Sequence, residues 1–370
     1  MTFIDIKNSD CVKELQCIKD RSVHLVLTDP PYFLHKMDKN WDNKTIATTN
    51  SRRIKNLPSG MKFDPRQSVE FGLFFQKIAS EFFRILVPGG FLISFSQPRL
   101  YQRMAVASED AGFWIRDMLI WHYTKKTQVK AFSLNSWIDK RRIPSDEKER
   151  LKEKIGGRKT PQLKNEFESI MLAQKPVEKN FIDNYDIWET GLIDTSITLD
   201  NKFPSNVIKI EKPNEKEKVN HPTQKPIYLL EFLIKIFTKE KQIVCDPFLG
   251  SGTTALACYN TKRSFVGFEK EQEYFFLAKE RLEKEMSKEE VRKQQCIEAQ
   301  ELIKQCVLEV VCEQTECGGV GPKAISEILG LYRKHPINDG IVYEMLNELA
   351  VEEKIEKKQR GKYVKKNPIK

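Results

Sequence analysis

One stretch of the sequence has the residue types of a ligand-binding loop. Residues 244–254 read VCDPFLGSGTT, in which an apolar run ends at Asp246 and Gly250 and Gly252 flank a serine. Glycine lets the backbone turn tightly and lie close to a ligand before a helix begins. The loop has neither a GxGxxG pattern nor a Lys-Ser/Thr pair, so it does not match the loops that hold a pyrophosphate. An ordinary turn between a strand and a helix is the structural alternative.

An acidic residue follows this loop at the end of the next apolar run. Residues 264–270 read SFVGFEK, and Glu269 ends the strand that this run predicts. In dinucleotide-binding folds, an acid at this point accepts hydrogen bonds from both hydroxyls of a ribose. A glutamate after a strand would indicate nothing by itself, so the assignment depends on its spacing from Gly252.

A second stretch combines a carboxylate, two prolines and an aromatic ring. Residues 28–33 read TDPPYF and follow the apolar run 23–27. Two consecutive prolines exclude a helix and end a strand, because each lacks an amide hydrogen and fixes its φ angle. Taken alone, Asp-Pro-Pro-Tyr indicates a rigid turn.

The elements that must position these residues alternate between strands and helices. Helical spacing predicts helices at 11–18, 68–86, 100–111 and 226–238, and another that runs through Cys258. Apolar runs predict seven strands, at 2–7, 23–28, 91–96, 118–122, 169–174, 242–245 and 264–268. This alternation predicts an α/β, three-layer, doubly wound domain over residues 1–285.

The rest of the chain, residues 287–370, is charged and helical. A long helix is predicted at 291–311, and two amphipathic helices follow in GPKAISEILGLYRK and INDGIVYEMLNELAVEEKI. Two short strands are then predicted around Arg360-Gly361. A helix, a turn, a second helix and a basic hairpin occur in this order in winged-helix modules.

Composition and charge narrow the class of protein. The 370 residues carry a net charge of +10, and a surface of that charge attracts polyanions such as nucleic acid. A basic protein without such a partner is the alternative. No apolar stretch reaches the roughly 18 to 20 residues that span a bilayer, and the first residues do not read as a signal peptide, so we expect a cytoplasmic protein without a membrane partner. The eight cysteines lack the paired spacing of a zinc site, and no metal is expected.

The motifs occur in the order of a known family. The string HPTQKPIYLLEFLIKIFTKEKQIVCDPFLGSGTT (221–254) closely resembles the C-terminal half of β-group amino-methyltransferases, which act on DNA with S-adenosylmethionine. In that family Asp-Pro-Pro-Tyr is the catalytic motif, and here it precedes the glycine loop. The resemblance covers about residues 1–285. It implies the seven-stranded, Rossmann-like, circularly permuted methyltransferase sheet of the β group, with the winged-helix-like module appended.

The resemblance also implies a set of cofactor residues. IDIKNSDCVKEL resembles the strand and turn in which an acid meets the adenine of the cofactor, and the HPTQKP turn closes over its methionine part. A capping turn is the structural alternative for the HPTQKP residues. The residues implied to bind S-adenosylmethionine are Asp10, Cys11, Thr223, Lys225, Asp246, Phe248, Gly250, Ser251, Gly252, Thr253 and Glu269.

The resemblance gives the Asp-Pro-Pro-Tyr turn a catalytic role. The exocyclic amine of adenine is a poor nucleophile, because its lone pair is delocalised into the ring. Asp29 and the carbonyl of Pro30 are expected to accept its two hydrogens, and Pro31 helps to fix these acceptors in advance. Tyr32 is expected to stack on a base that has left the duplex.

Adenine N6 is the expected target, because an aspartate at the first motif position is typical of adenine-N6 enzymes and a serine is typical of cytosine-N4 enzymes. Cytosine-N4 methylation is the alternative among enzymes. A non-catalytic DNA-binding regulator on this scaffold is the alternative of another class.

Two segments between the motifs are expected to recognise the target. Residues 125–165 are rich in lysine and arginine and 176–220 are irregular, and parts of both resemble type II adenine methyltransferases of restriction–modification systems. Solvated charge is the alternative for the basic run. Double-stranded DNA is the expected partner, and a cognate restriction endonuclease and a homodimer are further candidates. The expected phosphate contacts are Lys140, Arg141 and Arg142, together with Lys357, Lys358, Arg360 and Lys362 of the C-terminal hairpin.

Overall fold

The structure, a computed structural model, describes residues 2–31, 65–125, 131, 133–161, 163–215, 217–221, 223–314, 320–332, 339–352, 354–357 and 362–366. The chain divides into two compact units, Met1–Glu283 and Lys284–Lys370. The first unit has two buried cores and the second has one. The glycine loop and the start of the Asp-Pro-Pro turn both belong to the first unit.

A mixed sheet forms the centre of the first unit, and its strands lie in the order β1-β8-β7-β2-β3-β5-β4-β6. The strands are β1 (Ile4–Asn8), β2 (Val23–Thr28), β3 (Leu86–Ser96), β4 (Trp114–His122), β5 (Phe167–Gln174), β6 (Val207–Lys209), β7 (Ile243–Asp246) and β8 (Ser264–Glu269). β1, β8, β7, β2 and β3 are parallel, whereas β5 is antiparallel to β3 and β4. The carboxyl ends of the five parallel strands therefore meet at one edge, where β5 begins.

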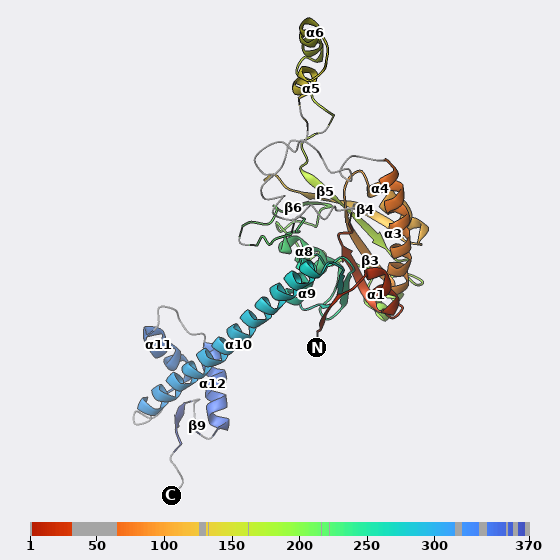
Figure 1. Cartoon of the computed structure of the whole chain (residues 1–370). Helices are drawn as coiled ribbons and strands as arrows, with labels where there is room; N and C mark the ends of the chain where they lie inside the picture. Colours follow the sequence, from red (N-terminus) through yellow and green to blue (C-terminus); the bar gives the residue numbers. More distant parts are fainter. Residues whose placement is uncertain are drawn as a thin grey trace. The chain divides into compact units, whose positions relative to one another are not determined.

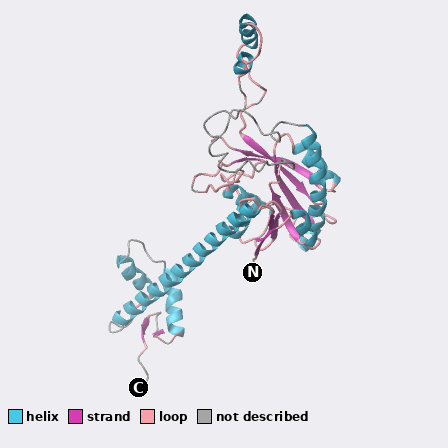
Figure 2. Ribbon diagram, in the orientation of Figure 1, coloured by secondary structure: helices cyan, strands magenta, loops and turns pink. Residues whose placement is uncertain are grey.

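Helices cover both faces of this sheet (Figure 1), which Figure 2 shows in magenta between cyan helices. Leu25 and Leu27 of β2 belong to the core under α8 (Ile227–Phe237) and α9 (Thr253–Asn260). Val26 belongs to the core under the helices of the opposite face. Those helices are α1 (Cys11–Cys17), α3 (Pro65–Ile85) and α4 (Tyr101–Asp110). Because side chains alternate along a strand, β2 is buried on both sides, and the unit is a three-layer α/β structure.

The described residues form one more strand in this sheet than the seven that the sequence predicted. β6 has three residues and pairs in parallel with β4, and only Ile208 among them is buried. A run this short with one buried side chain has no period by which the sequence could indicate a strand. The sheet is therefore eight-stranded and mixed.

β3 also begins earlier than predicted, at Leu86 and not at Phe91. Pro88, Gly89 and Gly90 lie inside the strand, although the sequence predicted a helix up to residue 86 and a strand only from residue 91. The pairing of β2 with β3 shifts its register at this point. Such an irregularity lets a strand accept a proline, which cannot donate a ladder hydrogen bond.

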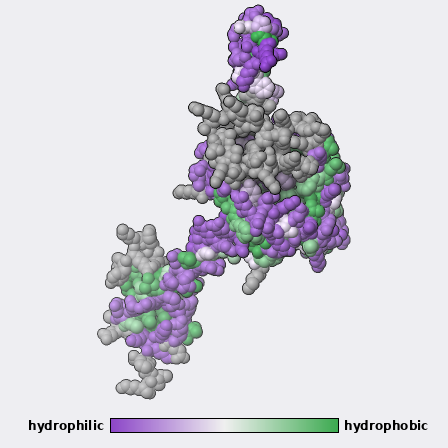
Figure 3. All heavy atoms as spheres, in the orientation of Figure 1, coloured by the Kyte–Doolittle hydropathy of each residue, from purple (hydrophilic) through white to green (hydrophobic). Residues whose placement is uncertain are grey.

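The described residues of the two segments expected to recognise the target, 125–165 and 176–220, include the helices α5, α6 and α7. α5 (Asn135–Asp139) packs against α6 (Ser145–Ile155), and Ser133 forms a bridge with Lys159 beside them. α6 buries none of its residues, and Figure 3 shows mainly hydrophilic residues on its surface. Asn180 caps the start of α7 (Phe181–Trp188), and its side chain accepts hydrogen bonds from two backbone amides. The role of these segments in target recognition remains a prediction.

The second unit contains helices and a hairpin. α10 (Gln272–Gln314) runs into it, and α11 (Pro322–Tyr332), α12 (Asp339–Val351), β9 (Ile355–Lys357) and β10 (Tyr363–Lys365) follow. β9 and β10 pair antiparallel, and Tyr363 forms a further bridge with Val320. The winged-helix interpretation of this unit remains a prediction. Among the residues that the structure describes, no helix is both long and apolar enough to cross a membrane.

Candidate active site

The carboxyl ends of β2 and β7 bring the Asp-Pro-Pro turn to the start of the glycine loop. The two strands pair in parallel, with Leu25 opposite Val244. At their ends, the Thr28 hydroxyl donates to Oδ1 of Asp246 over 2.8 Å. Asp29 follows Thr28 directly, so it lies at the same edge of the sheet as the loop.

Asp246 joins three elements at this edge. Its Oδ1 also accepts from the backbone amide of Phe248 at 3.1 Å, and its Oδ2 accepts from the hydroxyl of Thr254 at 2.6 Å. Its side chain is 3% exposed, and burial raises the pKa of Asp246 to about 6 in spite of these hydrogen bonds. The carboxylate thereby fixes the start of the glycine loop to β2 and to α9.

The glycine loop requires glycine for two reasons, conformation and space. Gly250 has φ +51° and Gly252 has φ +75°, which is the left-handed region that other residues avoid. A Cβ added to Gly252 would lie 2.7 Å from Cβ of Ala278 in α10. A Cβ added to Gly250 would lie 3.1 Å from Nε2 of His221. The backbone therefore fits closely between neighbouring elements.

The side chain of Glu269, at the end of β8, binds a backbone amide of this loop. Its Oε2 accepts from the amide of Gly250 at 2.7 Å, and its Oε1 accepts from the amide of Glu271 at 2.9 Å. Burial raises the pKa of Glu269 above its ordinary value. The acid that the sequence singled out by its spacing therefore does lie beside the glycine loop.

Arg281 of α10 also binds the loop, and the sequence analysis did not single it out. Its guanidinium donates to the carbonyl of Ser251 and, over 3.1 Å, to the hydroxyl of Thr253. Burial lowers the pKa of Arg281. The surrounding sequence, KERLEKE, reads as a solvated helix face, so no local signal could have found it.

The turn after β1 lies next to the end of β8. Asn8 is opposite Glu269 in the parallel pairing of the two strands. Asp10 caps α1, and its Oδ2 lies 3.3 Å from Nζ of Lys270. Cys11 is buried, and burial raises its pKa to about 12, so it remains a thiol at neutral pH. The structure thus brings the predicted residues Asp10 and Cys11 to the Glu269 end of the site.

Lys225 of the HPTQKP turn lies at the centre of an ion-pair cluster that the sequence did not predict. Its ammonium contacts Oδ2 of Asp29 and lies 3.5 Å from Oε2 of Glu168. It also lies over the ring of Phe95, 4.9 Å from the centroid. Burial alone would lower the pKa of Lys225, but the charges of Asp29 and Glu168 raise it above its ordinary value.

His221 lies in the same turn, close to the glycine loop. Its ring meets the ring of Tyr274 edge-on at 4.7 Å. Burial lowers the pKa of His221 to about 4, so the imidazole is neutral at pH 7. Its buried Nδ1 has no hydrogen-bond partner among the described residues. Thr223 contributes its backbone carbonyl, which accepts from Lys225 at 3.3 Å.

The remaining predicted residues lie at the ends of other elements or outside the described residues. Phe248 packs against Phe74 of α3, with ring centroids 6.1 Å apart. Pro30 is buried and Pro31 is exposed. The structure describes five of the residues predicted to contact phosphates. Lys140, Arg141 and Arg142 follow α5, and Lys357 and Lys362 belong to the hairpin of the second unit. The predicted residues outside the described residues are Tyr32, Lys358 and Arg360.

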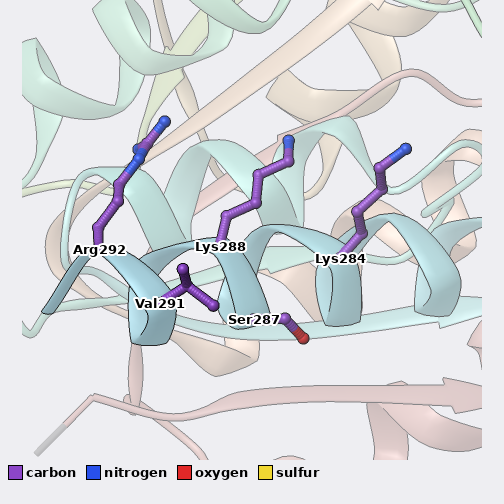
Figure 4. A pocket seen from close by; sticks show the side chains of 5 residues that line it. All are labelled: Lys284, Ser287, Lys288, Val291 and Arg292. Atoms are coloured by element: carbon purple, nitrogen blue, oxygen red, sulfur yellow. The ribbon is translucent and has the colours of Figure 1, made fainter. Parts of the chain in front are cut away.

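The second unit has a shallow depression of its own. A depression on α10 is lined by one face of the helix, and its basic side chains project in one direction (Figure 4). It is formed by Lys284, Ser287, Lys288, Val291 and Arg292, all of the second unit. Within the described residues, no group of three or more histidine, cysteine or acidic side chains could hold a metal ion.

Comparisons with known proteins agree with these motifs. A family model described as DNA methylase, of the N6/N4 methyltransferases, matches residues 23–280. The type II methyltransferase M.HindIII of Haemophilus influenzae is 31% identical over 75% of this chain and 94% of its own length. The type II methyltransferase M2.DpnII of Streptococcus pneumoniae is 29% identical over 75% of this chain and 89% of its own.

A solved structure shares the fold. The cytosine-N4-specific PvuII DNA methyltransferase superposes with a TM-score of 0.51 at 18% identity, over 75% of this chain and 86% of that one. At this identity the likeness concerns the fold alone.

Replacing Gly252 by alanine is expected to destabilise the first unit. Gly157 offers a matched control, because it has φ +74° but no atom within 4 Å of an added Cβ. In both variants the left-handed conformation of an alanine lowers the free energy of unfolding by about 1–2 kcal/mol. Only Gly252→Ala adds a steric clash with α10. The free energy of unfolding, followed by tryptophan fluorescence in urea, should fall by clearly more for Gly252→Ala. Equal losses would show that the space beside Ala278 does not constrain the loop.

The buried carboxyl of Asp246 predicts a pH dependence of stability. Its pKa is about 6 in the folded chain and returns towards 3.8 on unfolding. Between these values the folded state holds a proton that the unfolded state has lost, so the contribution of Asp246 to the free energy of unfolding decreases as pH rises. The stability of the wild type minus that of Asp246→Asn should fall by roughly 2 kcal/mol from pH 4 to pH 6, because a shift of one pKa unit corresponds to about 1.4 kcal/mol and part of the titration lies outside this window. Parallel pH curves for the two proteins in urea denaturation would contradict this.

Proposed function

The chain belongs to the N6/N4 DNA methylase family, and we propose that it transfers a methyl group from S-adenosylmethionine to the N6 amino group of adenine in double-stranded DNA. The observation that carries this proposal is the pairing of β2 with β7. That pairing places Asp29 at the edge where the glycine loop begins, and the Thr28–Asp246 hydrogen bond joins the two motifs. A type II restriction–modification system is the setting that the relatives named above support.

The residues around the glycine loop fit S-adenosylmethionine, which supplies the methyl group on a sulfonium sulfur. Gly250 and Gly252 have no Cβ at positions where an added Cβ would lie close to atoms of His221 and Ala278. Glu269 uses one lone pair of each oxygen for a backbone amide, and a second pair remains on each for the ribose hydroxyls. Nδ1 of His221, for which the described residues offer no hydrogen-bond partner, is a further polar atom beside the loop. Asp10 and Cys11 would lie at the adenine end.

Asp29 would act on the target amine as a fixed acceptor. Its carboxylate and the carbonyl of Pro30 accept the two amino hydrogens, which draws the lone pair out of the ring and towards the methyl group. Pro30 is buried, and the two prolines restrict the backbone that carries both acceptors. Acceptors that are fixed in advance need no reorganisation at the transition state. The target base must leave the duplex to reach them, with Tyr32 as the proposed stacking partner.

The order of the motifs supports a circularly permuted sheet of the β group. The strand that leads to the proposed catalytic turn, β2, comes early in the chain, and the strand that leads to the glycine loop, β7, comes late. The two are neighbours in the sheet. The segments proposed to read the target, 125–165 and 176–220, lie between them in sequence.

DNA contacts outside the catalytic turn are proposed for two basic regions. Lys140, Arg141 and Arg142 follow α5 and are exposed. The second unit would bind DNA as a winged helix, with the basic hairpin as its wing. Alternatively, it would form the interface of a homodimer. A cytoplasmic location and a cognate endonuclease stay predictions from the sequence.

A methyl-transfer assay distinguishes the candidate activities. Tritiated S-adenosylmethionine and unmethylated DNA, followed by nucleoside analysis, should yield N6-methyladenine. Detection of N4-methylcytosine would show that the target base is cytosine and not adenine. The absence of any methylated nucleoside would favour a DNA-binding regulator. Asp29→Ala should lower turnover by at least about a hundredfold with cofactor affinity nearly unchanged. Asp5→Ala, an exposed aspartate of β1, is the matched control and should keep full turnover.

Salt dependence tests the proposed phosphate contacts. Each lost phosphate contact lowers the slope of log affinity against log salt by about 0.9. Replacing Lys140, Arg141 and Arg142 together by alanine should therefore weaken DNA binding and flatten this slope. The control is a triple alanine variant of exposed lysines elsewhere in the first unit, Lys13, Lys19 and Lys241. The assignment is wrong if both triple variants show the wild-type slope in fluorescence anisotropy titrations.

A further inference from the structure

One face of α10 lies against the glycine loop. Ala278 and Arg281 are three positions apart in this helix, so their side chains lie on the same face. Ala278 is fully buried, and its Cβ would lie 2.7 Å from a Cβ added to Gly252. Nη1 of Arg281 donates to the carbonyl of Ser251 and, over 3.1 Å, to the hydroxyl of Thr253. The helix therefore supports the loop by a close backbone contact and by a cation.

The peptide between Ser251 and Gly252 is held at both of its polar atoms. Its amide hydrogen is donated to the carbonyl of Leu249 at 2.9 Å, and its carbonyl oxygen accepts from Arg281. Gly252 has φ +75°, and glycine populates positive and negative φ about equally readily. The residue that lets the loop turn tightly therefore does not fix the orientation of this peptide. The hydrogen bonds from Arg281 and to Leu249 select one orientation.

Two charged side chains from outside the loop bind different polar atoms of its backbone. Glu269 accepts from the amide of Gly250 at 2.7 Å, whereas Arg281 donates to the carbonyl of Ser251. This division follows from chemistry, because an ionised carboxylate only accepts hydrogen bonds and a guanidinium only donates them. Two peptides of the loop are thus fixed by side chains of opposite charge. Glu269 already has a proposed role towards the cofactor, and Arg281 has none.

We infer that Arg281 is a positioning residue of the cofactor site, which keeps the glycine loop in the conformation that binds S-adenosylmethionine. Arg281 acts through the backbone of the loop and not through a contact with the cofactor. A loop that is ordered before the ligand arrives binds it more tightly, because binding does not have to supply that order. This inference rests on the proposed function, since it takes the loop as the site of this cofactor.

The surroundings of Arg281 suit a permanent support. Burial lowers the pKa of Arg281 and the charge of Glu217 opposes this effect, but an arginine stays protonated in a protein. Its hydrogen bonds to the loop therefore do not depend on pH in the neutral range. The charge of Arg281 also acts on His221, but burial is the largest cause of the low pKa of that imidazole. His221 thus remains neutral near pH 7 when Arg281 is replaced.

Replacing Arg281 by methionine tests the inference in the full-length chain. Methionine keeps an unbranched apolar side chain but donates no hydrogen bond, so the Ser251 carbonyl loses its donor. The Kd for S-adenosylmethionine, measured by isothermal titration calorimetry without DNA, should rise about tenfold or more. Arg281→Lys keeps a cation with fewer donors, so its Kd should lie between those of the wild type and Arg281→Met.

Two further measurements separate binding from chemistry. The KM for S-adenosylmethionine should rise by about the same factor as its Kd, while kcat at saturating cofactor stays within about twofold, because the loop binds the ground state and the transition state equally. The Kd for the product S-adenosylhomocysteine should rise by the same factor as that for S-adenosylmethionine. Arg281 positions the loop and not the methyl group, so the ratio of these two constants should not change.

Lys279→Met is the matched control. Lys279 is an exposed cation of the same helix, 3.8 Å from Glu283, and its replacement should leave the Kd for S-adenosylmethionine unchanged. A merely structural role for Arg281 would lower the unfolding temperature and the number of binding sites per chain but leave the Kd of the folded fraction unchanged. That result would overturn the inference, and so would a wild-type Kd in Arg281→Met.

If the methionine variant is insoluble, Arg281→Lys decides, with an expected rise in Kd of at least about threefold; a wild-type Kd in the lysine variant would then overturn the inference. Failure of the proposed function is a separate result, because the wild-type protein would then show no binding of S-adenosylmethionine.

Discussion

The hydrogen bond between Thr28 and Asp246 joins residues that are 218 positions apart in the chain. It forms because β2 and β7 are parallel neighbours, which end at the same edge of the sheet. Any shift in this pairing would separate Asp29 from the glycine loop, since both follow directly from the ends of these strands. The two strands are held by cores on both faces of the sheet, so the burial of residues such as Leu25 and Val26 fixes the position of the chemical groups.

The reversed direction of β5 adds a feature that a fully parallel sheet would lack. Because β5 runs against its neighbours, its first residues lie at the edge where β2 and β3 end. Glu168 can therefore reach Lys225, while Gln174 lies at the opposite end of the strand. There the Gln174 amide donates to the carbonyls of Gly89 and Gly191 at 3.0 and 3.1 Å. One strand thus supplies a charge at the functional edge and a structural hydrogen bond at the other.

The sequence predicted the parts of the site whose chemistry is local. The glycines, the two prolines and the acid that ends β8 could be singled out from their neighbouring residues, and the structure places Glu269 against Gly250 as the spacing indicated. The helices and most strands followed from apolar periodicity for the same reason. The family model extends over 23–280, which agrees with the resemblance drawn from those motifs.

The residues that the sequence could not indicate make their contacts with residues that are far away in the sequence. Arg281 reads as one cation on a charged helix, and its role appears only when α10 lies against the loop. Glu168 reads as a polar residue before an apolar strand, and β6 is too short to show a period. Lys225 was assigned to the cofactor by resemblance, and its contact with Asp29 depends on a pairing across 196 residues. No local pattern carries such information.

Two kinds of constraint therefore meet at this edge of the sheet. Glycine and proline fix the backbone by steric limits, which do not depend on pH or on a ligand. The charged groups are fixed by each other, because a buried ammonium is stable only with carboxylates close to it. Asp29 is subject to both constraints, since a rigid turn carries its backbone and Lys225 holds its carboxylate. Its backbone is therefore restricted by the two prolines that follow it, and its carboxylate is held by a charge from the HPTQKP turn, 196 residues away in the chain.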